Sequence, residues 1–165
     1  MENHFVNLQA LDGNSWGQAD FAEKITVLSF TDQKSQDISA KVGSALGKRF
    51  LENERFQIAT AVKVPSMFKG LAGALLKAGQ AKARESAARK FKKQGKIAPA
   101  GINERIHVLF DIDGKCSQEV LSEWVNGQAR LLLVDENGDI LGQSCHEDPE
   151  KAVEALAGDI AAALG

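Results

Sequence analysis

The sequence is poor in the residues that staple small folds or carry common redox motifs. Its 165 residues include two cysteines, three histidines, three prolines and no tyrosine. Cys116 and Cys145 lie 29 residues apart, which is neither the spacing of a zinc site nor that of a CxxC motif. We therefore expect no metal, no cofactor and no disulfide framework.

Long apolar runs and a net charge of one sign are also missing. The 20 basic and 22 acidic residues nearly cancel, so the net charge of −2 predicts no particular partner for the whole molecule. No stretch approaches 18 apolar residues, and the opening MENHFVNL has no basic start, so we predict neither a transmembrane segment nor a signal peptide. We expect a soluble cytoplasmic protein, or a periplasmic one if a leader was removed before residue 1.

The length of 165 residues and the hydrophobic content of 44% predict one domain over 1–165, and the order of its predicted strands and helices makes it an α/β domain. Its organising stretch is Lys24–Phe50. Ile25–Phe30 is β-branched and apolar, which is typical of a strand buried on both faces. A helix that Asp32 or Ser35 can cap should follow, with these apolar positions at helical spacing: Ile38, Val42, Ala45, Leu46 and Phe50.

Further strands and helices alternate along the chain. The Asp-Gly-Asn-Ser turn within residues 5–21 suggests a small hairpin or extended lead-in, with Trp16 and Phe21 packed on the sheet. We predict strands at 56–64, 106–112, 129–134 and 139–143, and helices at 66–94, 116–124 and from Asp148 onward. The strand at 56–64 should be parallel to the first. Asn137-Gly138 predicts a tight hairpin between the last two strands.

The helix at about 66–94 is unusually basic. Residues 63–96 hold ten of the 20 cations against one acid, Glu85. We expect Phe68, Leu71 and Leu75 to anchor the helix on the sheet, while cations of its second half face solvent. The candidate partner-binding residues are Lys82, Arg84, Arg89, Lys90, Lys92 and Lys93. Such a helix attracts a protein partner or another anionic surface such as lipid, although a solvated structural helix is an equal alternative.

Nucleic acid is a less favoured partner, because no stacking aromatics are interleaved with these cations.

The element order, with VLSF, HVLFDIDGK and ARLLLVDENGDILGQ, resembles the thioredoxin-like superfamily in its peroxiredoxin and thiol-disulfide reductase branches. The resemblance covers about residues 10–165. It implies a three-layer sandwich with a mixed central sheet, a carboxyl-terminal β-hairpin and flanking helices.

The resemblance also implies a reactive cysteine at the start of the first helix. This sequence instead has Thr31, Asp32, Lys34 and Ser35 in that turn, so Ser35, or Lys34, stands where the cysteine is expected. A serine without a nearby base cannot exchange disulfides or reduce peroxide. The family's cis-proline position, before the hairpin, reads Gly127-Gln128-Ala129. We therefore predict a redox-inactive thioredoxin-like domain that serves as a binding or adaptor module.

The alternative is an atypical thiol oxidoreductase or peroxiredoxin-like enzyme that uses Cys116 or Cys145. Cys116 follows Lys115 at a helix start, where a thiolate is stabilised, although a structural cysteine is favoured. Cys145 adjoins His146, but neighbouring residues on a strand point to opposite faces. His4, His107 and His146 have no ligand spacing, and His107 lies within a strand, where a structural role is favoured.

Overall fold

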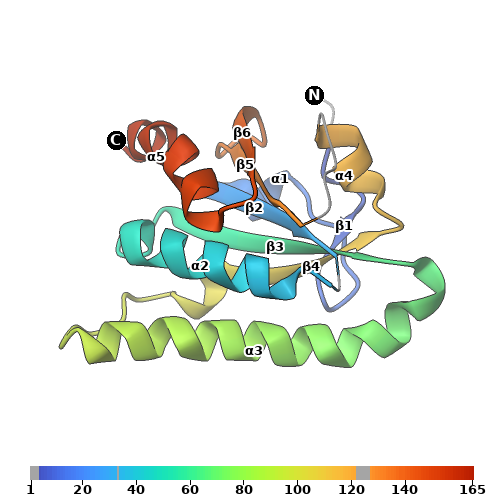
Figure 1. Cartoon of the computed structure of the whole chain (residues 1–165), viewed down its shortest axis with the longest axis horizontal. Coiled ribbons are helices and arrows are strands. Elements are labelled where there is room, and N and C mark those ends of the chain that lie inside the picture. The colour runs from blue at the N-terminus through green and yellow to red at the C-terminus, as the bar shows by residue number, and fades with distance from the viewer. Residues whose placement is uncertain (1–3, 33, 122–126) are drawn as a thin grey trace.

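The computed structural model describes residues 4–32, 34–121 and 127–165, and its strands form one mixed sheet (Figure 1). The sheet order is β1-β4-β3-β2-β5-β6. The strands are β1 Leu8–Gln9, β2 Ile25–Thr31, β3 Phe56–Val64, β4 Ile106–Ile112, β5 Ala129–Val134 and β6 Ile140–His146. The helices are α1 Gln18–Phe21, α2 Gln36–Phe50, α3 Lys69–Lys93, α4 Lys115–Val120 and α5 Pro149–Leu164, with 3-10 turns at Ser66–Phe68 and Asn103–Arg105.

The predicted central strand is confirmed, since all seven residues of β2 are buried. It pairs in parallel with β3 and antiparallel with β5, and β3 pairs in parallel with β4. The lead-in contributes β1, which pairs antiparallel with β4, and a bridge between Gln9 and Ser15. The helix predicted at 116–124 is present as α4 up to Val120, and residues 122–126 lie outside the described part.

The carboxyl-terminal hairpin and helix also form as predicted. Oδ1 of Asp135 accepts the backbone N–H groups of Asn137 and Asp139, and Gly138 has a φ of +85°, which favours glycine. Asp148 caps α5, because its Oδ1 accepts the backbone N–H of Glu150. These local bonds explain why the two segments could be predicted from short sequence patterns.

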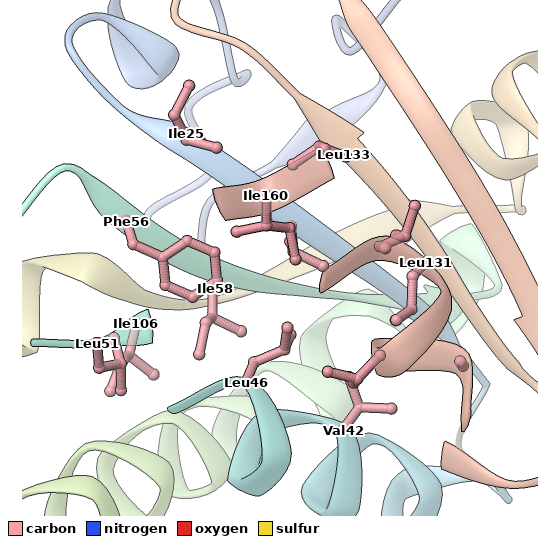
Figure 2. Close-up of a cluster of buried hydrophobic side chains, with 14 of the residues drawn as sticks. Ile25, Val42, Leu46, Leu51, Phe56, Ile58, Ile106, Leu131, Leu133 and Ile160 are labelled. Atoms are coloured by element: carbon pink, nitrogen blue, oxygen red, sulfur yellow. The ribbon is translucent and has the colours of Figure 1, made fainter. Parts of the chain in front are cut away.

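Buried apolar residues form three clusters on the sheet, of which the third joins α3 to β3 and β4 through Leu76, Val62 and Phe110. One lies beneath α2 and α5 and includes Val42, Leu46, Ile58 and Ile160 (Figure 2). On the other face, Trp16 and Phe21 pack with Leu28 and Leu132, as expected for the lead-in. No helix of the described residues combines the length and the apolar character needed to cross a membrane.

The predicted anchoring of α3 is wrong. Leu71 and Leu75 are 76% and 72% exposed and Phe68 is 47% exposed, whereas the buried residues of α3 are Ala72, Leu76 and Phe91. The open edge of β4 explains this orientation. Because β1 pairs only with Phe110 and Asp111, the edge groups of Ile106 and Val108 need other partners.

Two side chains of α3 supply those partners. Oε1 of Gln80 accepts the backbone N–H of Val108 at 3.0 Å, and Nε of Arg84 donates to the carbonyl of Ile106 at 2.9 Å. Gln80 and Arg84 continue the helix face of Ala72 and Leu76, at four-residue spacing. This face therefore turns toward the sheet, and Leu71 and Leu75 turn toward solvent.

Candidate functional site

The turn between β2 and α2 is held by hydrogen bonds among its own residues. Oδ1 of Asp32 accepts the N–H of Lys34 at 2.9 Å, the Asp32 carbonyl accepts the N–H of Ser35 at 3.3 Å, and the Thr31 hydroxyl donates to the same carbonyl. Ser35 is the N-cap residue of α2, as the sequence suggested, but its side chain accepts no capping hydrogen bond. These bonds, and not a bond from the Ser35 side chain, therefore hold the turn.

The Ser35 hydroxyl is not hydrogen-bonded to a candidate general base in the described part of the chain. No side chain there hydrogen-bonds its hydroxyl, and no group of three or more His, Cys, Asp or Glu residues converges anywhere in residues 4–32, 34–121 and 127–165. A serine hydroxyl needs an adjacent base to become a nucleophile.

A buried arginine that the sequence did not single out lies beside this turn. Arg130 of β5 is 1% exposed, and its Nε and Nη2 donate to the Phe30 carbonyl at 3.4 and 3.2 Å. Burial lowers the pKa of Arg130, while the nearby charges of Asp32 and Cys145 raise it. Its only sequence signal is a cation inside the apolar run ARLLLV.

Cys145 lies across from this arginine. Residues 130 and 145 are paired in the β5–β6 register, so both side chains project from the same face of the sheet. The exposed Cys145 thiol donates to Oε1 of Gln128 at 2.8 Å. His146 is not its base, because Nδ1 of His146 accepts the backbone N–H of Asp148. Asp32, Arg130 and Cys145 thus gather at one end of the sheet.

Cys116 lies inside the fold and not at its surface. It is buried in α4, where its backbone N–H donates to Oδ1 of Asp111 at 2.9 Å and its thiol lies 3.7 Å from the His4 carbonyl. Burial raises the pKa of the Cys116 thiol strongly, and the charges of Asp111 and Glu119 raise it further. The predicted thiolate stabilisation by Lys115 is therefore wrong.

The six candidate cations of α3 fall into two groups. Arg84 is half-buried and bonded to β4, Arg89 pairs with Glu85 at 2.9 Å, and Lys90 donates to the Ser44 hydroxyl of α2. Lys82, Lys92 and Lys93 are exposed, and none of them is bonded to another described residue. The basic helix therefore offers fewer available charges than its sequence suggests.

The chain resembles solved structures of thioredoxin-like proteins. Peroxiredoxin Q from Xanthomonas campestris aligns with a TM-score of 0.57 at 11% identity, over 96% of this chain and 91% of that one. A Chlorobium tepidum protein assigned as the thiol:disulfide interchange protein DsbE gives 0.54 at 23% identity, over 96% and 92%. The exposed lipoprotein thioredoxin of Streptococcus pneumoniae gives 0.52 at 14% identity, over 92% and 96%.

Together with the strand order, these likenesses show that the protein has a thioredoxin-like fold. The mixed sheet, terminal hairpin and flanking helices implied by the resemblance are thereby confirmed. Comparison of the sequence with family models and with curated proteins finds no match. At these identities the likeness shows the fold, and the activity has to be argued from the residues themselves.

Proposed function

We propose that this protein is a thioredoxin-like binding module without redox activity, which docks on an anionic lipid surface through α3. The observation that carries the proposal is the outward side of α3. Large apolar side chains and unpaired lysines are exposed together there, although the same helix buries only Ala72, Leu76 and Phe91.

The outward side of α3 forms a continuous stripe. Its members follow one another at three- or four-residue intervals, so they lie on one side of the helix. This outer stripe consists of Leu71, Leu75, Ala78, Lys82, Glu85, Arg89 and Lys93, all exposed. Met67, which is 80% exposed, and Phe68 extend its apolar end. Apolar side chains that enter the headgroup region beside lysines are the usual composition of interfacial helices.

The charge available for such docking is modest but sufficient. Two lysines of the outer stripe, Lys82 and Lys93, and Lys92 beside it are exposed and have no partner in the described part of the chain. Each contributes about 1 kcal/mol near an anionic leaflet, and the attraction is screened by salt. The apolar end supplies a second, salt-independent contribution. Docking should therefore need both parts of the outer stripe.

Vesicle flotation tests the proposal. Wild type should float with phosphatidylglycerol-containing vesicles at low salt, and not with pure phosphatidylcholine. The variant Lys92→Glu/Lys93→Glu should lose binding at least a hundredfold, because each reversal replaces an attraction of about 1 kcal/mol by a repulsion of similar size. The matched control Lys41→Glu/Lys151→Glu makes the same charge change on the exposed surfaces of α2 and α5. It should bind like wild type.

The apolar part is tested separately. Leu71→Ser/Leu75→Ser should abolish flotation without lowering the unfolding temperature, because both leucines are mostly exposed. If wild type does not bind anionic vesicles at low salt, the proposal is wrong. Flotation of wild type with a loss in the control double variant equal to that in Lys92→Glu/Lys93→Glu would also reject α3 as the docking surface.

The redox-inactive part of the proposal is supported by Ser35 at the expected nucleophile position and by the buried thiol of Cys116. Insulin reduction and peroxide consumption should therefore be no faster than the background reaction. The same assays on Cys116→Ala/Cys145→Ser serve as the control. Turnover by wild type that disappears in the double variant would refute the inactive assignment.

Cys145 gives a specific reason to consider a second function, that of a single-thiol oxidoreductase. A guanidinium that faces an exposed thiol favours the thiolate, which is the attacking form. The thiolate would attack a substrate disulfide and form a mixed disulfide, and the departing thiolate would take up a proton. Reaction of Cys145 with an aromatic disulfide at pH 7 should then be clearly faster than that of glutathione. A rate no faster than that of glutathione would eliminate this function.

A further inference from the structure

A cleft of about 650 Å³ lies between α2 and α3 and reaches the sheet. Figure 1 shows the two helices running along the same face of the sheet. Ile58, Thr60 and Val62 of β3 and Ile106 of β4 contribute to its floor. Thr60 is partly exposed although β3 is an internal strand of the sheet. Solvent therefore reaches the sheet through the cleft, whose volume is typical of small-molecule sites.

Small residues on the two walls leave the space between α2 and α3 unfilled. Gly43 and Gly47 of α2 and Gly79 and Ala83 of α3 line it. A Cβ atom added at Gly43 or at Gly79 would meet no atom within 4 Å. Lys90 of α3 bridges the walls through its bond to Ser44 of α2. At these glycine and alanine positions the open space is bounded by backbone and by short side chains.

Among the charged residues that line the cleft, lysines outnumber the acids Asp37 and Glu52, and the surface of the cleft is mainly apolar. Lys48 and Lys82 line it and have no partner among the described residues, and Lys90 and Lys96 line it as well. Glu52 of the rim is already paired with Lys96. Leu51, Leu76 and Phe91 add apolar walls beneath these charges. An occupant that matches this polarity has an apolar chain and one negative end.

We infer that the cleft binds a single-chain amphiphile with one anionic head group, such as a fatty carboxylate. The apolar chain lies along the floor between α2 and α3, and the carboxylate meets the lysines of the rim. This site is separate from the outer stripe, apart from Leu75 and Lys82 at their shared border. A lipid surface and a free amphiphile are therefore recognised by different parts of α3.

Calorimetric titration with dodecanoate, in the absence of vesicles, tests the inference. Wild type should bind one dodecanoate saturably. Decanoate should bind about sixteenfold more weakly, because each buried methylene changes affinity about fourfold. Dodecyltrimethylammonium, which has the same chain and a positive head, should not bind. Because no vesicles are present, the result does not depend on lipid-surface docking.

Matched variants locate the site. Gly79→Leu should fill the cleft and weaken dodecanoate binding at least tenfold. Gly70→Leu is its control, because Gly70 also lies in α3 with nothing within 4 Å of an added Cβ but does not line the cleft. Ala83→Leu is a second blocking variant if Gly79→Leu does not fold. Lys48→Glu should weaken binding about tenfold, and Lys41→Glu, on α2 away from the cleft, should not.

Three results would overturn the inference. The first is the absence of saturable dodecanoate binding by wild type. The second is equal weakening by Gly79→Leu and Gly70→Leu, and the third is equally tight binding of dodecyltrimethylammonium. If wild type instead forms a dimer that Gly79→Leu disrupts, and binds no dodecanoate, the cleft is an interface with a second copy of the chain.

Discussion

Substitution by alanine should change the free energy of unfolding very differently at two adjacent leucines of α3. Leu75 is 72% exposed and Leu76 is 5% exposed, although both are leucines in the middle of one helix. We expect Leu75→Ala to change the free energy of unfolding by less than about 0.5 kcal/mol, as for surface substitutions generally. Leu76→Ala removes a buried side chain, for which the usual cost is about 2–5 kcal/mol.

The position of Leu76 sets the expected value within that range. Its side chain packs with Val62, Ala72 and Phe110, but it also lines the open cleft between α2 and α3. A side chain with one open side forfeits fewer contacts on truncation, so we expect a cost near the lower end, about 2 kcal/mol. For a chain of this length, that corresponds to a fall of roughly 4–8 °C in the unfolding temperature.

Urea unfolding followed by circular dichroism gives both values under the same conditions. The midpoint for Leu75→Ala should coincide with that of wild type, and the midpoint for Leu76→Ala should fall, with similar slopes. A larger loss in Leu75→Ala than in Leu76→Ala would refute the orientation of α3. It would also restore the anchoring that the sequence pattern suggested.

Three further predictions concern buried polar groups and thiols. Arg105 donates to three backbone carbonyls, so Arg105→Leu should cost about 2–4 kcal/mol in urea unfolding, whereas Arg55→Leu at the surface should cost under about 1 kcal/mol. Burial lowers the pKa of His107, with the charge of Arg84 adding to the effect; the folded state therefore binds a proton less readily than the unfolded chain. Stability should consequently fall as the pH drops below about 6.5, and His107→Gln should flatten this dependence; an unchanged slope would contradict the assignment. Alkylation at pH 7.5 should modify one thiol per native chain, Cys145, and two in urea, and rapid native labelling of Cys116 would contradict its burial.

Most of the fold could be predicted from the sequence because its signals are local. Apolar β-branched runs identify β2, β3 and β4, and Asn137-Gly138 identifies the hairpin through the positive φ that glycine accepts. The start of α5 is likewise specified within three residues, by Asp148, Pro149 and Glu150. Each of these strands, turns and helix starts can be recognised from residues within its own segment of the sequence.

The orientation of α3 could not be predicted in the same way. Leu71 and Leu75 form an apolar pair at four-residue spacing, and Ala72 and Leu76 form another, so periodicity alone favours the larger side chains. The bonds that decide between them join the helix to β4, through Gln80 and Arg84. Those bonds depend on which edge of β4 is left open by β1, a property of the assembled sheet.

The neighbours of the residues at the candidate site are likewise distant in the sequence. Arg130 donates to the carbonyl of Phe30, 100 residues earlier in the chain, and is paired in register with Cys145 on the next strand. In the sequence itself, Arg130 is only a single cation within an apolar strand. The absence of a cysteine near Ser35, in contrast, can be seen directly in the sequence.

A fluorescent probe on the outer stripe tests the central claim most directly. An environment-sensitive maleimide dye is attached to Leu71→Cys in a Cys145→Ser background, with Cys116 protected by burial. Adding vesicles that contain phosphatidylglycerol at low salt should shift the emission to the blue, and pure phosphatidylcholine vesicles should not. The same dye on Ala161→Cys, exposed on α5, should show no shift. An unchanged spectrum at position 71, or equal shifts at both positions, would contradict docking through α3.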